Sequence, residues 1–181
     1  MRELGSAVVL VTGVMAAGKS TVAQLLAERL ARSVHLRGDG FRRMIVSGRE
    51  EFTPRPSTEA TAQLRLRHRA SAAVADLYAR EGWTVVVQDV VLGGHLDAYL
   101  EAVTTRPRYL VVLAPRPDAV AAREADRPKN GYGGPWTIDA LDEALRRDTP
   151  RRGLWLDTSH QTPHQTVDQI LAGLDAARVA G

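Results

Sequence analysis

Apolar runs alternate with helical patterns along this chain of 181 residues. The runs are short and rich in valine and leucine, which is typical of strands buried on both faces of a parallel sheet. They predict strands at Ala7–Gly13, Ser33–Arg37, Trp83–Val90, Tyr109–Ala114 and Leu154–Ser159. Between them, helical spacing predicts helices at Lys19–Arg32, Phe41–Val46, Ser57–Arg80, His95–Val103, Asp118–Asp126, Ile138–Arg147 and from Thr162 onward. Strands that alternate with helices build βαβ units, so the pattern predicts an α/β fold.

The segment after the first predicted strand matches the phosphate-loop pattern G-x-x-x-x-G-K-[ST] in full. Glycines allow backbone N–H groups to turn toward phosphate oxygens, and the N-terminus of the following helix favours the same anion. We therefore expect ATP here, with Lys19 on the β- and γ-phosphates and Ser20 on Mg²⁺. The strand–loop–helix setting argues against a chance glycine-rich turn. The candidate nucleotide-binding residues are Gly13, Ala16, Ala17, Gly18, Lys19, Ser20 and Thr21.

Two aspartates follow predicted strands: Asp39 comes after the second strand and Asp89 after the third. Ligands of α/β sheets bind at the carboxyl ends of the strands. Asp39 is therefore a candidate catalytic base that accepts the proton of an attacking hydroxyl, the alternative being a helix cap. Asp89 is a candidate Mg²⁺ ligand, directly or through water, or a substrate contact. The alternative for Asp89 is a carboxylate that only ends a strand.

A glycine-rich segment around residues 123–137 predicts a flap. Cations on a flap can close over ATP and neutralise charge in the transition state, so Arg123 and Arg127 are candidate catalytic residues. The alternative for each is a solvated surface charge. Tyr132 and Trp136 flank the glycines, where they either stack on a ligand or pin the flap to the body.

Composition favours a globular protein, with 44% hydrophobic and 25% charged residues. Cysteine is absent, which excludes disulfides and thiolate chemistry. Of 24 basic residues only Lys19 and Lys129 are lysines, so the phosphate-loop lysine stands out against an arginine-biased background. A net charge of +3 without aromatic–basic interleaving argues against nucleic acid as a partner. The N-terminal apolar run is far shorter than the ~20 residues of a membrane span, so we expect a cytoplasmic protein with no membrane partner.

Three classes of phosphate-loop protein compete: small-molecule kinases, GTPase switches and remodelling ATPases. The Asn-Lys-x-Asp guanine motif of GTPases is missing, and 181 residues leave little room for the extra lid domain of a remodelling ATPase. We therefore expect one kinase domain over residues 1–181. It would contain the flap around 123–137 and an acceptor-binding segment around 39–70.

The chain resembles the chloramphenicol phosphotransferase family of small phosphate-loop kinases, which act on a hydroxyl of an antibiotic. The likeness lies in the phosphate loop, Asp39, Asp89-Val-Val-Leu-Gly-Gly, the strand and arginine-bearing helix at Val111–Arg127, and Leu156-Asp-Thr-Ser. It implies that Asp39 is the base, that Arg123 and Arg127 are flap arginines, and that Asp157 and Thr158 lie near adenine. Together with the alternating pattern, it leads us to expect a three-layer α/β/α sandwich whose five-stranded parallel sheet has the order 2-3-1-4-5.

The acceptor-binding segment departs from that family because it contains many arginines: Arg42, Arg43, Arg49, Arg55, Arg65, Arg67 and Arg69. Such cations would suit an acidic or already phosphorylated acceptor. The alternation at 65, 67 and 69 cannot place all three on one side of a helix, so at least one is solvated. Our candidate acceptor contacts are Asp39, Arg42, Arg43, Asp89 and Leu92.

The function we expect is ATP-dependent phosphoryl transfer to a hydroxyl of a small molecule, such as an antibiotic or a related metabolite. Two alternatives stay open: a nucleotide or polynucleotide end kinase, and a nucleotide-dependent binding or switch ATPase that has no acceptor. The sequence also leaves a homo-oligomer open.

Overall fold

The computed structural model describes residues 1–126, 132 and 134–180. Five parallel strands form one sheet in the order β2-β3-β1-β4-β5, which confirms the expected order. The strands are β1 (Ala7–Gly13), β2 (Ser33–Arg37), β3 (Thr84–Gln88), β4 (Arg108–Leu113) and β5 (Leu154–Leu156).

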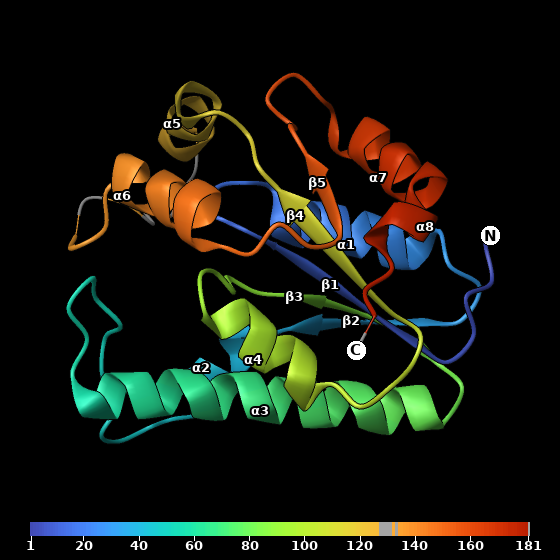
Figure 1. The fold of residues 1–181 in the computed structure, drawn as a ribbon, viewed down its shortest axis with the longest axis horizontal. Helices are drawn as coiled ribbons and strands as arrows, with labels where there is room; N and C mark the ends of the chain where they lie inside the picture. The colour runs from blue at the N-terminus through green and yellow to red at the C-terminus, as the bar shows by residue number, and fades with distance from the viewer. Residues whose placement is uncertain (127–131, 133, 181) are drawn as a thin grey trace.

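Helices cover both faces of this sheet, so the expected three-layer α/β/α arrangement is confirmed (Figure 1). The helical elements are α1 (Lys19–Glu28), α2 (Asp39–Arg43), α3 (Thr58–Arg80), α4 (His95–Ala102), α5 (Pro117–Ala125), α6 (Ile138–Glu143), the π-helical turn η1 (Ala144–Asp148), α7 (Pro163–Ala172) and α8 (Leu174–Ala177). In Figure 1, α3 and α4 lie below the sheet and α1, α7 and α8 lie above it. Within the described residues, no helix is both long and apolar enough to span a membrane.

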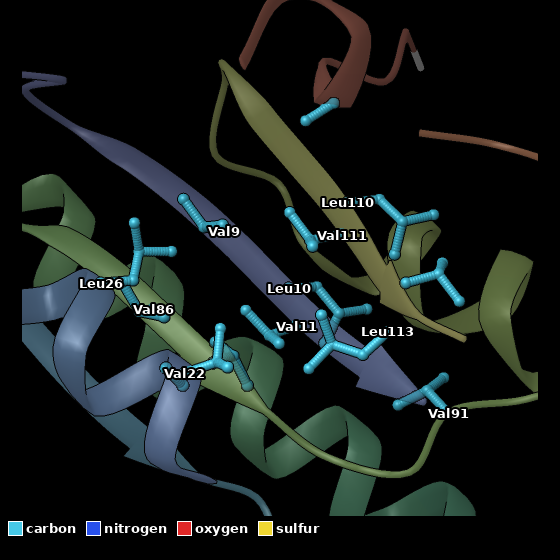
Figure 2. Packing of buried hydrophobic residues seen from close by; sticks show 14 of the residues in the cluster. Val9, Leu10, Val11, Val22, Leu26, Val86, Val91, Leu110, Val111 and Leu113 are labelled. Carbon is cyan, nitrogen blue, oxygen red and sulfur yellow. The ribbon is translucent and has the colours of Figure 1, made fainter. Parts of the chain in front are cut away.

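Strand β1 is the centre of the core, and all seven of its residues are buried. Val9 pairs with Val86 of β3 on one side and with Tyr109 of β4 on the other. Figure 2 shows Val22 and Leu26 of α1 among the aliphatic side chains of the sheet. A strand that is covered on both faces favours apolar residues, which explains the run in the sequence. The polar residue in β1, Thr12, donates its hydroxyl to the Val91 carbonyl oxygen at 3.0 Å.

Polar caps fix where several helices begin. Ser57 accepts a hydrogen bond from the Ala60 N–H at the start of α3. Thr162 and Gln165 form a capping box at the start of α7, and Pro163 lies in the first turn of that helix. These caps satisfy N–H groups that have no partner inside the helix, so they stabilise the predicted starting points.

Several helix boundaries differ from the sequence prediction, and α1 ends at Glu28 instead of Arg32. The short helix predicted from Phe41 begins at Asp39, which places an acidic side chain in the first turn of α2, where it suits the helix dipole. The helix predicted for 138–147 changes into the π-helical turn η1, where the Thr149 hydroxyl donates to the Ala144 carbonyl oxygen at 2.8 Å. The C-terminal helix divides at Gly173, which packs closely against the Leu154 side chain.

Asp76 joins α3 to the loop that follows α4. Its buried carboxylate accepts hydrogen bonds from the Thr104 N–H (2.9 Å), the Thr104 hydroxyl (2.7 Å) and the Thr105 N–H (2.9 Å). Burial alone would raise the pKa of Asp76, but these hydrogen bonds outweigh burial and hold the pKa below its ordinary value. The ionised carboxylate therefore stabilises the fold.

We expect Asp76→Ala to lower the free energy of unfolding by about 1–3 kcal/mol, because buried donors lose their acceptor. Because the folded pKa lies below the ordinary value of 3.8, this stabilisation is present above that pH and is lost as the pH falls through the folded pKa. Urea denaturation measures the difference. The control is Asp168→Ala, since Asp168 pairs with Arg29 on the surface and should change stability by under about 1 kcal/mol. Equal losses in the two variants would contradict this role of Asp76.

Candidate active site

A cavity of about 610 Å³ opens where β1, β2 and β3 end. Because the strands are parallel, their carboxyl ends meet at one edge of the sheet, and the segments that follow them meet there too. The cavity brings together most of the predicted site residues: Ala16, Ala17, Gly18, Lys19, Ser20, Thr21, Asp39, Arg43, Asp89, Arg123 and Thr158.

The phosphate loop joins β1 to α1 at the floor of this cavity. Gly13 sits so close to the Leu113 carbonyl of β4 that a Cβ atom there would clash with it, which accounts for glycine at the first position of the motif. Ala16 takes a left-handed backbone conformation with φ of 59°, and Gly18 caps α1 without a side chain. The loop therefore curls around the N-terminus of α1, the geometry that presents N–H groups to phosphate.

Lys19 and Ser20 are the first two residues of α1. The Lys19 side chain is buried, and its ammonium group donates to the Val14 carbonyl oxygen of the loop at 2.6 Å. Ser20 is exposed on the same cavity. A cation and a hydroxyl thus stand beside the curled loop, where the motif places them.

A buried charged contact of the cavity joins Asp89 to Arg67 of α3. The Arg67 Nε donates to Asp89 Oδ2 at 2.8 Å, and Arg67 Nη2 donates to Asp89 Oδ1. The Asp89 side chain is 1% exposed and that of Arg67 15% exposed. Burial raises the pKa of the Asp89 carboxyl, and the Arg67 guanidinium opposes that rise. Gly38 lies against this carboxylate, because a Cβ at Gly38 would overlap Asp89.

Asp39 lies at the end of β2 with two arginines around it. Arg43, one turn further along α2, donates to Asp39 Oδ2 at 2.6 Å, and Arg37 Nε lies 3.7 Å from Oδ1. The Asp39 side chain is 35% exposed, so it remains open to the cavity. Asp39 and Asp89, 50 positions apart in the sequence, therefore face one space.

The described part of the predicted flap contacts the phosphate loop. Arg123 of α5 donates to the Thr158 carbonyl oxygen and, at 3.4 Å, to that of Ala17. The Tyr132 hydroxyl donates to the Met15 carbonyl oxygen at 2.9 Å. Arg127 and Lys129 lie outside the described residues.

The two residues expected near adenine differ in their surroundings. Thr158 lines the cavity, and its buried hydroxyl has no hydrogen-bond partner among the described residues. Asp157 is exposed and accepts hydrogen bonds from the Ser159 N–H (2.9 Å) and hydroxyl, which lower the pKa of Asp157. Thr158 is thus the better placed of the two to meet a ligand.

A second cavity of about 730 Å³ adjoins the first. Met15, Arg67 and Val90 line both cavities, so the boundary passes between the phosphate loop, α3 and the end of β3. Two predicted acceptor contacts, Arg42 and Leu92, line the second cavity, whereas Arg43 lines the first.

Sequence reasoning missed the partner of Arg67 and the aromatic wall of the second cavity. The alternation at 65, 67 and 69 predicts that these arginines do not all lie on one side of the helix. In the structure Arg65 and Arg69 are exposed, whereas Arg67 points inward. Phe52 and Trp136 stack with ring centroids 6.4 Å apart although 84 positions separate them. For Trp136 the sequence predicts one of two roles, stacking on a ligand or pinning the flap, but no local signal points to Phe52.

Within the described ranges, no group of three or more histidine, cysteine, aspartate or glutamate side chains could hold a metal ion. Ser20 and Asp89, the predicted Mg²⁺ residues, line the same cavity. Both oxygens of Asp89 are held by Arg67, so Ser20 is the more accessible of the two predicted Mg²⁺ residues.

The parallel sheet of order 2-3-1-4-5, with a phosphate loop that opens α1, defines a phosphate-loop protein of the kinase-like fold. A family model described as "AAA domain" matches residues 8–147, so the chain belongs to that family. Among curated proteins, none matches the chain in sequence.

Solved structures of a sugar kinase, an APS kinase and a tunicamycin resistance protein share this fold. A sugar kinase from Janibacter sp. HTCC2649 is 19% identical with a TM-score of 0.69, over 94% of this chain and 95% of that one. The APS kinase of Mycobacterium tuberculosis, in complex with AMPPNP and APS, is 18% identical with a TM-score of 0.67, over 93% and 97%. The tunicamycin resistance protein of Deinococcus radiodurans is 16% identical with a TM-score of 0.66, over 97% and 99%.

We expect Arg67→Met to lower the free energy of unfolding by about 3–5 kcal/mol, because it leaves the buried Asp89 carboxylate without its partner. The double variant Arg67→Met/Asp89→Asn should recover part of this loss, since it removes the buried charge. Denaturant titration gives both values, and Arg69→Met, at an exposed neighbouring position, is the control. If Arg67→Met were no less stable than Arg69→Met, the ion pair would have no structural role.

Proposed function

We propose that this protein transfers the γ-phosphoryl group of ATP to a hydroxyl of a small molecule. The observation that supports this most directly is the pair of adjoining cavities that share Met15, Arg67 and Val90. A donor in the first cavity and an acceptor in the second would meet at that boundary. Phosphoryl transfer depends mainly on positioning and on charge stabilisation, which such an arrangement supplies.

In this proposal the first cavity holds the nucleotide. The amides of residues 16–21 and Lys19 bind the phosphates at the N-terminus of α1. Arg123, which already bridges Ala17 and Thr158, stabilises charge on the transferred group, and Arg127 has the same role. The buried Thr158 hydroxyl, with no partner among the described residues, fits a contact to the nucleotide.

Mg²⁺ fits the oxygen donors of the first cavity, because it prefers hydroxyl, carboxylate and phosphate oxygens. Ser20 would contact it directly, and Asp89, whose oxygens are held by Arg67, would act through water. When bound, the metal neutralises charge on the β- and γ-phosphates.

Asp39 is the proposed catalytic base. Its carboxylate faces the cavity, and Arg43 and Arg37 hold it in place from two sides. A base must reach the hydroxyl that it deprotonates, and the carboxyl end of β2 places Asp39 beside the phosphate loop.

A second cavity of this size favours a kinase over a nucleotide-dependent switch, which needs no acceptor site. The two differ in ATP consumption, which a suitable alcohol stimulates in a kinase and leaves unchanged in a switch. A library of sugars, nucleosides and hydroxylated antibiotics, read by the mass increase of one phosphoryl group, tests the proposal. If no alcohol is phosphorylated and no library compound changes the rate of ATP hydrolysis, the kinase proposal fails.

We expect Lys19→Ala to weaken binding of a non-hydrolysable ATP analogue by about 10- to 100-fold, because a charge-assisted hydrogen bond to phosphate is lost. Calorimetric titration measures the affinity. Arg32→Ala, which removes a surface cation stacked on Trp83, is the control and should bind the analogue normally. Unchanged affinity in Lys19→Ala would place the phosphates elsewhere.

We expect Asp39→Asn to lower turnover by at least ~10²-fold and to leave the affinity for the ATP analogue nearly unchanged, because a general base acts only on the transfer step. Steady-state rates with the best acceptor from the library, together with the analogue titration, separate the two effects. Near-normal turnover in Asp39→Asn would exclude this residue as the base.

A further inference from the structure

Two aromatic side chains, Phe52 and Trp136, form part of the wall of the second cavity. Phe52 and Trp136 lie nearly parallel, at 15°, and the Trp136 Nε1–H donates to the Phe52 carbonyl oxygen at 2.9 Å. His95 meets Phe52 edge-on at 5.9 Å. The hydrogen bond fixes the indole in place, so the stacked pair presents an aromatic surface to the cavity on which a flat ligand can pack.

The rest of the wall is largely aliphatic. Side chains from the phosphate loop, the segment after α2, α3, the loop between β3 and α4, and α6 line it, namely Met15, Ile45, Leu64, Leu92 and Leu141. A lining of this kind gains free energy when it buries the apolar surface of a ligand.

The two cations of this wall are already paired. Arg42 donates to Glu51, and Arg67 binds Asp89. Each guanidinium on this wall therefore has a carboxylate partner before a ligand binds. They also leave no described cation on this wall for an anionic ligand to bind without breaking an ion pair.

Negative and neutral groups make up the remaining polar surface of the wall. Glu50 accepts a hydrogen bond from the Ser57 hydroxyl, and Asp148 pairs with Arg147, which lies outside the wall. Burial and the nearby Arg65 lower the pKa of His95, so the imidazole is neutral at pH 7. The first cavity, in contrast, is lined by Lys19 and four arginines.

Resting on the proposed phosphoryl transfer, we propose that the acceptor is an alcohol with a flat apolar ring and no anionic group. Its ring packs against Phe52 and Trp136, and its hydroxyl faces the boundary at Arg67. The phosphates of the donor stay in the cationic cavity, and the uncharged acceptor occupies the apolar one. Sugar phosphates, nucleotides and other anionic alcohols are excluded.

A matched pair of probes tests this inference by binding alone. One is naphthalenemethanol, which is neutral, and the other is a hydroxymethyl-naphthoate, which adds only a carboxylate. Ligand-observed NMR titration of the full chain gives both affinities, and the neutral probe should bind at least about tenfold more tightly. Equal binding, preference for the naphthoate, or no binding of either probe would overturn the inference.

Variants locate the binding and test the charge argument. Phe52→Ala and Trp136→Ala should each lower the affinity for the neutral probe by about three- to tenfold, because each removes an aromatic ring from the wall. Trp83→Ala, which removes an indole stacked with Arg32 at the other end of β3, is the matched control. Glu51→Gln removes the carboxylate partner of Arg42. It should raise the affinity for the naphthoate by up to about fivefold and leave the affinity for the neutral probe unchanged. If neither Phe52→Ala nor Trp136→Ala weakens binding relative to Trp83→Ala, the probe sits elsewhere and the inference fails.

The result separates this inference from the kinase proposal. Neutral-probe binding with the expected variant pattern, but no phosphorylation of any alcohol, would leave the cavity assignment intact and refute phosphoryl transfer. Phosphorylation of an anionic alcohol in preference to neutral ring alcohols would support the kinase and refute the acceptor class.

Discussion

The buried ion pair between Asp89 and Arg67 joins the two halves of the site. Asp89 ends a central strand beside the phosphate loop, whereas Arg67 projects from α3, which also lines the second cavity. Taking a carboxylate out of water is unfavourable unless it is paired and hydrogen-bonded, so α3 must stay where its guanidinium can reach. The boundary between the cavities is therefore fixed by an electrostatic requirement of the core as well as by packing.

This requirement explains how charge is distributed around the site. Arginines are abundant throughout the chain, but in the acceptor-binding segment Arg42, Arg43 and Arg67 are each held by a carboxylate. The cations near the phosphate loop, Lys19 and Arg123, instead donate to backbone carbonyl oxygens. Phosphate oxygens can replace such carbonyl groups at the moment of binding, so the two cavities suit ligands of different charge.

The fold followed from the sequence because the apolar runs specify buried strands and the phosphate-loop motif specifies how the first strand joins its helix. The common location of Asp39 and Asp89 also followed, since parallel strands bring their carboxyl ends to one edge; their chemical roles remain predictions. The partner of Arg67 could not be predicted, because it depends on how α3 is rotated against the sheet. The contact of Phe52 with Trp136 joins distant segments and leaves no periodic trace, so the aromatic wall of the second cavity appeared only in three dimensions.

The most direct measurement is a crystal structure of the chain with a non-hydrolysable ATP analogue and Mg²⁺. We expect the γ-phosphate to lie within about 3 Å of the Lys19 ammonium and to point toward the boundary between the cavities at Arg67, with Asp39 beside it. A nucleotide bound with its γ-phosphate turned away from the second cavity, or bound outside the phosphate loop, would show that donor and acceptor do not meet at this boundary.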